Sequence, residues 1–352
     1  MHQICKILVV LFFFQLSYGQ IGGKNAFEFI NLPLNAKVSG IGGENVSVRD
    51  GDPNMIFHNP ALLNADMKYR AGVNYRHYFA DIAATSAVYA FDIKNLGVVA
   101  AALQYVNYGN AKSTDATGLQ NGEVSASEFA FTATHSRTIE NYSLGVNVKF
   151  AGSQIASYSS YGLMTDIGGV FKHPTKDLTL GLLIKNIGFP VKNYDYGRIS
   201  QMPFDVQAGV TYKLAHMPLR LSITIHHLYV WDISYDDPKR VTSYDINGNP
   251  QRERVSVVDN IARHFVIGGE FLLAKGFHIR TGYNHFRRSE LKLENETGLS
   301  GFSIGCMLKI KAVELAYTSA FYHVAGGNNV FSIIVSLDKF FKKPEIPKEA
   351  VN

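Results

Sequence analysis

The chain has 352 residues, a formal net charge of +5, 12% aromatic residues and only 18% charged residues. This length allows one large domain or two ordinary ones, and the charged fraction is below the roughly one quarter that is usual for soluble domains. The small, unclustered net charge argues against a nucleic-acid-binding protein.

The first segment indicates export. "MHQICKILVVLFFFQLSYGQ" places Lys6 ahead of an apolar run from Ile7 to Phe14, and Ser17 and Gly19 supply the small residues of a cleavage site. This pattern predicts a Sec-type signal peptide over residues 1–19, which is too short to span a bilayer. A buried N-terminal strand or helix is the alternative interpretation.

Residues 20–68 differ from the rest of the chain. "FEFINLPLNAKVSGIGGENVSVRDGDPNMIFHNPALLN" is rich in Gly, Asn and Pro, and it holds short apolar pieces but no full strand. The segment is too apolar for a disordered tail. We therefore predict a hatch, or plug, folded into the mouth of the barrel described below, with His58, Asn59 and Pro60 as candidate hatch residues.

Two motifs inside this segment resemble ligand loops only in part. "GIGGEN" at Gly40–Asn45 lacks the GxGxxG spacing and the strand–helix context of a phosphate-binding turn. "DGDPN" opens like a calcium loop, but Met55 and Ala61 stand where that loop needs Gly and Glu. We predict no metal and no cofactor.

Fourteen segments between residues 69 and 338 alternate apolar and polar residues with a period of two, and no window keeps a helical apolar stripe. In "SLGVNVKFAG", Leu144, Val146 and Phe150 share one face of an extended chain, whereas Asn147 and Lys149 share the other. Most segments exceed the roughly nine to eleven residues that a tilted membrane strand needs. The approximate spans are 69–79, 82–93, 96–107, 122–139, 142–155, 159–173, 177–188, 203–214, 218–231, 261–274, 276–287, 298–309, 312–322 and 329–337.

The polar face of these segments carries strong charges at Arg70, Arg76, Lys149, Arg220 and Arg280. Burial of an unpaired charge in a dry core costs several kcal/mol, and a hydrated lumen removes that cost. We therefore predict that these five residues line a lumen and that the apolar face contacts lipid.

The connections between the segments alternate in length. Six of them are tight turns, such as Lys94-Asn95 and Lys275-Gly276, while others, such as 108–121 and 189–202, are long. Short turns at one end and long loops at the other are typical of an outer-membrane barrel with periplasmic termini. The prediction is an all-β fold: a 14-stranded antiparallel transmembrane β-barrel over residues 69–338 in the cell outer membrane, followed by a charged periplasmic tail at 339–352.

The connection at 232–260 is the longest and the most polar, with acidic "YDDP" separated from basic "RER". It is either a solvated loop or a surface that docks a protein or lipopolysaccharide, since loops carry binding on rigid scaffolds. The candidate partner-binding residues are Tyr235, Asp236, Asp237, Lys239, Arg240, Arg252 and Arg254.

Histidines provide no convincing active site. His226 and His227 are adjacent in a predicted strand, where side chains point to opposite faces, so this geometry does not let them share a metal. His285 points to the apolar face, but its in-phase neighbours Tyr283 and Thr281 supply no convincing nucleophile. We predict that the chain is not an enzyme.

Six segments together resemble the PorQ family: "INLPLNAKVSGIGGENVSVRDGDPNMIFHNPALL", "YGNAKSTDATG", "GEVSASEFAF", "KLAHMPLRLSITIHHLYVWDISYDDP", "HFVIGGEFL" and "RTGYNHFRRSELKL". The resemblance runs from Gly22 to Leu337, which makes it far more specific than a short motif. "HNPALL", His58–Leu63, is also similar to the N-terminal hatch of PorV and of the fatty-acid transporter FadL, which are fourteen-stranded relatives. The tail after Phe340 departs from the family pattern.

PorQ-family proteins are outer-membrane barrels of the type IX secretion system of Bacteroidota. The resemblance implies a scaffold that holds the surface protein PorZ beside PorU and PorV in an attachment complex. There PorU removes the C-terminal signal of secreted cargo and links the cargo to anionic lipopolysaccharide, so no catalytic residue carries over to this chain. The alternative is a FadL-like conduit for hydrophobic small molecules, although the polar inward residues favour a wet or plugged lumen.

Overall fold

The computed structural model describes residues 25–78, 82–114, 117–194, 200–234, 243–244, 250–251, 256–291, 298–323 and 326–341. The predicted signal peptide at 1–19 and most of the predicted tail at 339–352 lie outside these residues. Among the described residues, no helix is long and apolar enough to cross a membrane.

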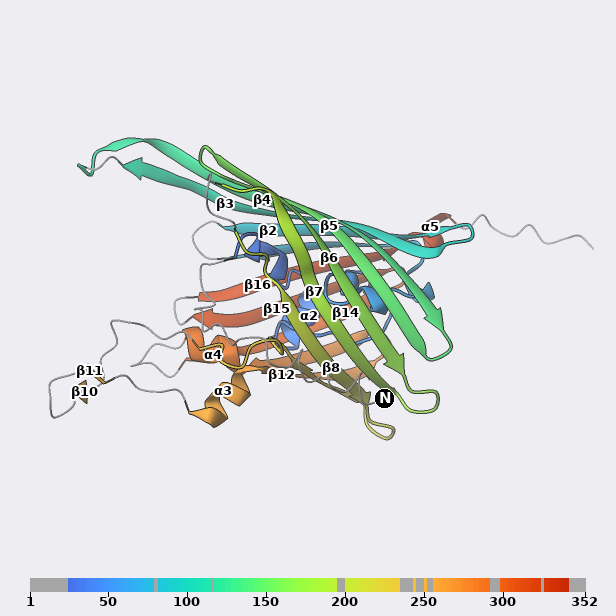
Figure 1. The fold of residues 1–352 in the computed structure, drawn as a ribbon. Coiled ribbons are helices and arrows are strands. Elements are labelled where there is room, and N and C mark those ends of the chain that lie inside the picture. Colours follow the sequence, from blue (N-terminus) through green and yellow to red (C-terminus); the bar gives the residue numbers. More distant parts are fainter. Residues whose placement is uncertain are drawn as a thin grey trace, which may run out of the picture.

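Fourteen antiparallel strands form one closed barrel, in which the first strand pairs with the last (Figure 1). The strands are β1 (Arg70–His77), β2 (Ala83–Ile93), β3 (Gly97–Thr114), β4 (Gln120–Ile139), β5 (Tyr142–Ile155), β6 (Tyr158–Lys172), β7 (Leu178–Lys192), β8 (Asp205–Lys213), β9 (Leu219–Ile225), β12 (Phe265–Ala274), β13 (Phe277–Asn284), β14 (Phe302–Ile310), β15 (Val313–His323) and β16 (Gly326–Ser336). Closure pairs every strand on both sides, so the wall has no free edge. The predicted fold class is confirmed.

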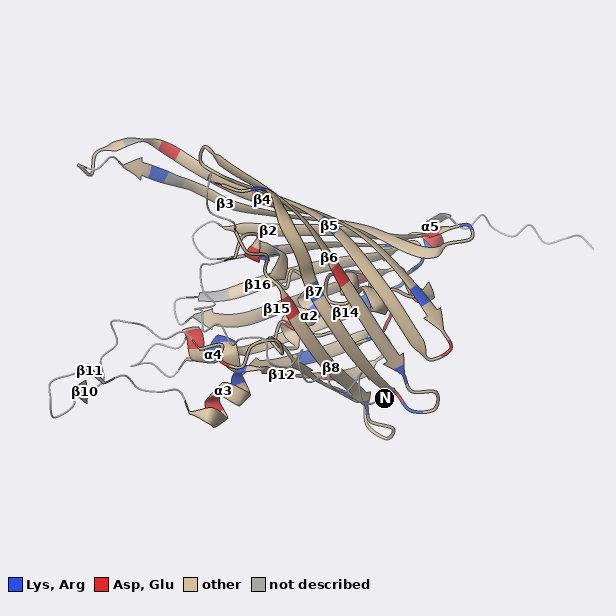
Figure 2. Ribbon diagram, in the orientation of Figure 1, with Lys and Arg blue, Asp and Glu red and all other residues tan. Residues whose placement is uncertain are grey.

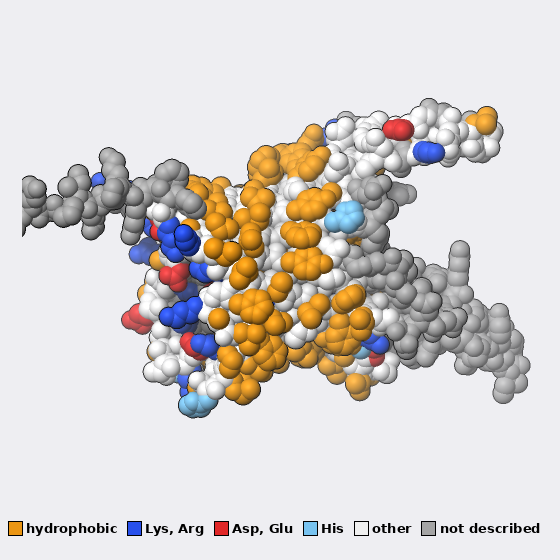
Figure 3. Space-filling view, turned by 180° about the vertical axis from the view of Figure 1, so that it is seen from behind, with side chains coloured by type: hydrophobic (Ala, Val, Ile, Leu, Met, Phe, Trp, Pro, Cys, Tyr) orange, Lys and Arg blue, Asp and Glu red, His pale blue; other side chains and the backbone are white. Residues whose placement is uncertain are grey.

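The two faces of the wall follow the alternation of the sequence. On β5, the side chains of Leu144 and Val148 are 69% and 57% exposed, whereas Asn147 and Lys149 are 0% and 1% exposed. The same alternation covers the outside of the barrel with apolar side chains, seen as a band between its two ends in Figure 3. Lys, Arg, Asp and Glu occupy few positions along the strands (Figure 2). The apolar face therefore points outward, as predicted.

The two ends of the barrel differ. Tight turns such as Lys94–Leu96, Glu140-Asn141 and Lys275-Gly276 lie at one end, and β1 begins and β16 ends there. The opposite end carries the longer connections, including α3 (Val257–Arg263), α4 (His285–Leu291) and the two-residue strands β10 (Ser243–Tyr244) and β11 (Pro250–Gln251). These are named below the short-turn end and the long-loop end.

Several predicted strand limits were wrong at the long-loop end. The predicted loop 108–121 is largely a two-stranded ribbon, because β3 and β4 stay paired to Thr114 and Gln120, with register shifts after Asn107 and Ser113 (Figure 1). Its outer edges pair with no other wall strand, and most of its described residues are exposed, so neither face calls for apolar side chains. Conversely, the predicted strand 218–231 ends at Ile225, and the predicted strands 261–274 and 276–287 include parts of α3 and α4.

The hatch, described from residue 25 to residue 68, lies inside the barrel as one short α-helix and four 3-10 turns (Figure 1). These are η1 (Glu28–Asn31), α2 (Ala36–Gly40), η2 (Pro53–Phe57), η3 (Pro60–Leu62) and η4 (Ala65–Met67). Its apolar side chains form two clusters with inward residues of the wall, one around Ile56 and Leu62 and one around Phe27 and Phe29. The chain enters β1 at Arg70, next to the predicted boundary at 68–69.

Candidate functional site

The hatch is built from short turns that its own Asn and Asp side chains cap. Asn35, Asp52, Asn59 and Asn64 each begin a turn, and each side chain accepts a hydrogen bond from the backbone N–H two residues later. Pro follows the cap in η2 and η3, where its fixed φ suits the first helical position. Repeated capping explains how a segment without a long periodic pattern still adopts a defined structure.

The hatch contacts the wall around its whole circumference. Toward β14, β15 and β16, the backbone of α2 and its ends bonds to Ser303, Thr318 and Ser332. Toward the opposite wall, the Asn59 amide donates to the Leu182 carbonyl of β7, and the Ser47 hydroxyl pairs with that of Thr211 on β8. The hatch therefore fills the lumen as a plug held on all sides.

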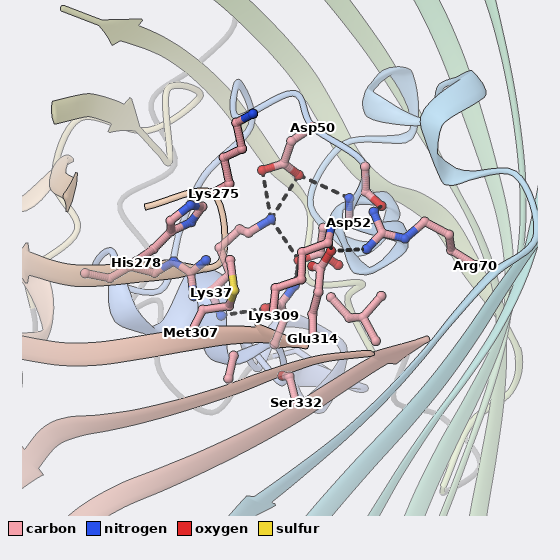
Figure 4. A pocket seen from close by; sticks show the side chains of 15 residues that line it. Lys37, Asp50, Asp52, Arg70, Lys275, His278, Met307, Lys309, Glu314 and Ser332 are labelled. Atoms are coloured by element: carbon pink, nitrogen blue, oxygen red, sulfur yellow. Dashed lines mark hydrogen bonds and ion pairs between the residues drawn. The ribbon is translucent and has the colours of Figure 1, made fainter. Parts of the chain in front are cut away.

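A network of ion pairs holds the hatch at the short-turn end. Lys37 Nζ lies 2.9 Å from Asp50 Oδ2 and 3.0 Å from Asp52 Oδ2, between the two carboxylates (Figure 4). Arg220 of β9 reaches Asp50 at 3.3 Å and donates through Nε to Glu270 Oε2 of β12 at 2.6 Å. Arg220 thus connects Asp50 of the hatch to the buried Glu270 carboxylate of the wall.

Arg280 of β13 completes this network. Its Nε lies 2.8 Å from Glu270 Oε1, and both side chains are 2% exposed. Lys37, Arg220 and Arg280 therefore face the three carboxylates of Asp50, Asp52 and Glu270. Buried charges arranged in this way are stable as a set and costly to break one at a time.

A polar cavity of about 180 Å³ adjoins this network, between the hatch and β1, β13, β14, β15 and β16 (Figure 4). Lys37, Asp50 and Asp52 line it from the hatch, and Arg70 and Glu314 line it from the wall. Arg70 pairs with Glu314 at 2.6 Å and also donates to the Gly51 carbonyl. Charges and hydrogen-bonding groups dominate this side of the lumen.

The other predicted lumen residues also face inward. Lys149 Nζ lies 2.6 Å from Asp166 Oδ2, and both side chains are 1% exposed. Arg76 donates to Asn328 Oδ1 and to the Pro33 carbonyl, and its guanidinium lies over the Tyr322 ring at 5.0 Å. The prediction of a hydrated lumen needs correction, because these charges are buried against partners and the hatch rather than surrounded by bulk water.

His58, Asn59 and Pro60 lie at the junction of η2 and η3. The amide of Asn59 donates to the carbonyl oxygens of Val46 and Leu182, so it ties two parts of the hatch to the wall. His58 is buried, and burial lowers its pKa to about 3, with nearby Lys185 acting in the same direction. The imidazole is therefore neutral at pH 7 and serves as a packed side chain.

Asp50 gives the hatch network a pH dependence. Burial alone would raise its pKa, but Lys37 and Arg220 outweigh that effect and hold the pKa below its ordinary value. A depressed carboxyl pKa contributes stability in full above the unfolded value of about 3.9, and that stability is lost as the pH falls through the folded value.

We expect the hatch of the purified protein to resist protease from pH 7 down to about pH 4 and to become cleavable only at lower pH. Cleavage of the hatch at pH 6 would contradict this assignment.

The candidate partner-binding residues Tyr235, Asp236, Asp237, Lys239, Arg240, Arg252 and Arg254 all lie outside the described residues. Of their connection, the structure describes the two ends, at residues 226–234 and 256–264, and the short strands β10 and β11. α3 at the second end leaves Val257 and Val258 exposed. The assignment of a docking role to this loop stays a prediction.

The expectation for His226 and His227 was wrong in geometry. β9 ends at Ile225, and His227 adopts a positive φ of 56°, so the two rings no longer point to opposite faces. The Nδ1 atoms of the two rings are in hydrogen-bonding contact. The described residues nevertheless contain no group of three or more His, Cys, Asp or Glu that could hold a metal ion.

His285 begins α4 rather than continuing β13. Its Nε2 lies 2.8 Å from Asp259 Oδ1 and its Nδ1 lies 2.8 Å from the Tyr283 hydroxyl. This arrangement has a carboxylate behind the imidazole, which sequence reasoning did not foresee. The Asp259–His285 contact joins α3 to α4, and a tyrosine hydroxyl stands where hydrolase triads have serine or cysteine.

Sequence reasoning weighed Asp50 and Asp52 only as part of a calcium loop, and it did not single out Asp166 and Glu270. A usable signal existed for Glu270, which stands between the outward residues Ile267 and Phe271 and in phase with the inward Gly268. An acid on the inward face of a predicted strand implies a cationic partner across the lumen. The identity of that partner depends on which strands the closed barrel brings together, so the sequence around Glu270 does not reveal it.

No family model and no curated protein matches the chain. Solved structures match in fold. Two are mutants of TodX, a P. putida toluene transporter: the deltaS2 mutant has a TM-score of 0.51 at 12% identity, and the deltaS2S3 mutant has 0.50 at 11%, each covering 86% of this chain and 97% of its own. A Pseudomonas aeruginosa FadL homologue has a TM-score of 0.45 at 13% identity and covers 85% of this chain and 97% of its own. These matches give no support to the PorQ family in particular. The chain therefore has a closed fourteen-stranded antiparallel barrel fold, which it shares with the TodX structures.

Proposed function

We propose that this chain is a non-enzymatic barrel of the outer membrane that anchors an extracellular protein, with its lumen closed by the hatch. The single observation that carries the proposal is the set of contacts that fixes the hatch inside the barrel. Residues 25–68 contact the wall on all sides, through hydrogen bonds such as that of Asn59 with Leu182 and through the ion pair of Asp50 in the hatch with Arg220 in the wall, at 3.3 Å. Opening such a lumen requires this ion pair and the hydrogen bonds between hatch and wall to break, which disfavours continuous conduction.

The location in the outer membrane is part of the proposal. An exterior of apolar side chains over a closed barrel is stable in hydrocarbon, where every backbone group must be paired. The predicted signal peptide supplies the route of export.

The proposed system is type IX secretion, in which the chain would hold a PorZ-like surface protein beside PorU and PorV, near anionic lipopolysaccharide. This part rests on the PorQ-like segments between Gly22 and Leu337 of the sequence. The proposed docking surface is the long-loop end, chiefly residues 232–260 with 189–202. Rigid scaffolds commonly present binding residues on such loops.

A second candidate function is favoured by the structural comparisons, which point to it more directly than to secretion. The matching TodX structures are described as monoaromatic hydrocarbon channels. Transport of hydrophobic small molecules by this chain would need the hatch to move, because the hatch occupies the lumen and contacts the wall on all sides.

Deletion of residues 240–255 tests the proposal. We expect the full-length chain, affinity-purified from the outer membrane and analysed by mass spectrometry, to retain a surface protein that the deletion variant loses at least about tenfold, since a loop that carries the docking contacts takes their binding energy with it. The matched control is a variant shortened in the ribbon, at residues 110–123, which should keep the partner. Undiminished capture by the 240–255 deletion would refute the docking surface. Uptake of toluene into liposomes by the full-length chain would establish the second function instead.

A further inference from the structure

The polar cavity at the short-turn end has more cationic than anionic side chains. Five cationic side chains line it, against three carboxylates. The cations are Lys37, Arg70, Lys275, Arg280 and Lys309, and the carboxylates are Asp50, Asp52 and Glu314. Such an excess inside a partly enclosed space raises the local potential and favours an anion.

The pairing around the cavity leaves part of this charge unused. Lys37 forms ion pairs with both hatch carboxylates, those of Asp50 and Asp52. Arg70 and Lys309 share the single carboxylate of Glu314, each at 2.6 Å. Lys275, in the turn between β12 and β13, forms no ion pair with any residue that the structure describes. It is exposed at the mouth of the cavity and is free to reach a ligand.

Arg280 provides a buried donor without a partner. The residue is 1% exposed, and its Nε is used by Glu270. Its Nη1 is buried, lacks a hydrogen-bond partner among the described residues, and belongs to a side chain that lines the cavity. A buried guanidinium N–H left unpaired is costly, and a charge-assisted bond to an oxyanion removes that cost.

We propose that this cavity binds a phosphate group, with Arg280 Nη1 as the inner donor and Lys275 at the mouth. The volume of about 180 Å³ is equivalent to roughly six waters at 30 Å³ each, which admits one phosphate and excludes a long acyl chain. The group comes either from free phosphate or from a phosphate ester such as a lipid headgroup. The site is independent of the proposed docking function, because it lies at the opposite end of the barrel.

The test is calorimetric titration of the full-length protein, purified in detergent without phosphate. Inorganic phosphate is one ligand, and sn-glycerol 3-phosphate, which mimics a lipid headgroup, is the other. We expect one of them to bind, and the tighter one identifies the source. Arg280→Lys keeps a cation beside Glu270 but removes the Nη1 donor, so affinity should fall about tenfold or more.

Lys275→Gln keeps the proposal testable if Arg280→Lys fails to fold, because Lys275 is exposed and makes no ion pair within the described chain. It should weaken binding about fivefold or more, and the loss should shrink at high salt. Lys94→Gln is the matched control: the same charge is removed from an exposed turn at the same end, outside the cavity. Absence of binding of either phosphate compound by the wild type, or equal affinities of Lys275→Gln and Lys94→Gln, would overturn the site and leave a cavity filled by water only.

Discussion

Glu270→Gln is expected to lower the free energy of unfolding by about 3–5 kcal/mol, since it removes the carboxylate of a buried ion network. The glutamine has nearly the same shape, so the loss is one of charge. Arg280, which is 1% exposed, would keep its charge without a carboxylate partner, and Arg220 would retain only the more distant Asp50. Unfolding in urea, followed by the loss of tryptophan and tyrosine fluorescence signals, measures the effect.

The control and the double variant decide whether pairing is the cause. Asp177→Asn breaks the Lys213–Asp177 pair, whose side chains are 44% and 64% exposed, and should cost at most about 1 kcal/mol. Combining Glu270→Gln with Arg280→Met removes both buried charges, so the double variant should lose less than the sum of the two single losses. Strict additivity would show that Glu270 and Arg280 do not stabilise one another.

The orientation of the wall could be predicted from the sequence because it is a local property. Leu144, Val146 and Phe150 alternate with Asn147 and Lys149, and a strand converts that alternation directly into two faces. The ribbon at 108–121 could not be predicted in this way. Most of its described residues are exposed, so no buried face imposes apolar residues at every second position.

The short helices α3 and α4 were missed for a related reason. Each has seven residues, too few to show a helical apolar stripe. α3 directly precedes β12 and α4 directly follows β13, so the alternating pattern of the strand continues into the helix. Their stability comes from contacts such as Asp259 with His285, which join residues 26 positions apart.

The structure of the hatch was even harder to predict from the sequence, because it depends on contacts between distant residues. Its presence follows from composition, and its turns follow from caps such as Asp52-Pro53 and Asn59-Pro60. The network that holds it joins Asp50 to Arg220, which are 170 positions apart. Such a pair exists only after the barrel has closed around the hatch, so charges could be assigned to the lumen but not to one another.

Addition of a single methyl group at Gly282 is expected to displace the hatch from its position against β12 and β13. Gly282 of β13 lies opposite Gly268 of β12, and together they leave a recess for the hatch at Ile41 and Gly42. A Cβ on Gly282 would stand 2.1 Å from the Gly42 backbone nitrogen and 2.2 Å from the Ile41 carbonyl carbon, distances that backbone atoms do not tolerate. Gly282→Ala should destabilise the protein by about 1–3 kcal/mol through overpacking.

Gly269→Ala is the matched control for this substitution, because Gly269 lies beside Gly268 on the outward face of β12. A Cβ there would meet only side-chain atoms of Thr281 and Leu221, at 3.7 and 3.8 Å. The control should be neutral or slightly stabilising, since alanine costs a strand less backbone entropy than glycine. In planar bilayers, Gly282→Ala should raise the ion conductance above that of the wild type, and Gly269→Ala should not, because only the first displaces the plug. Equal conductance of the two variants, with Gly282→Ala still folded as a barrel by circular dichroism, would mean that something other than the hatch closes the lumen.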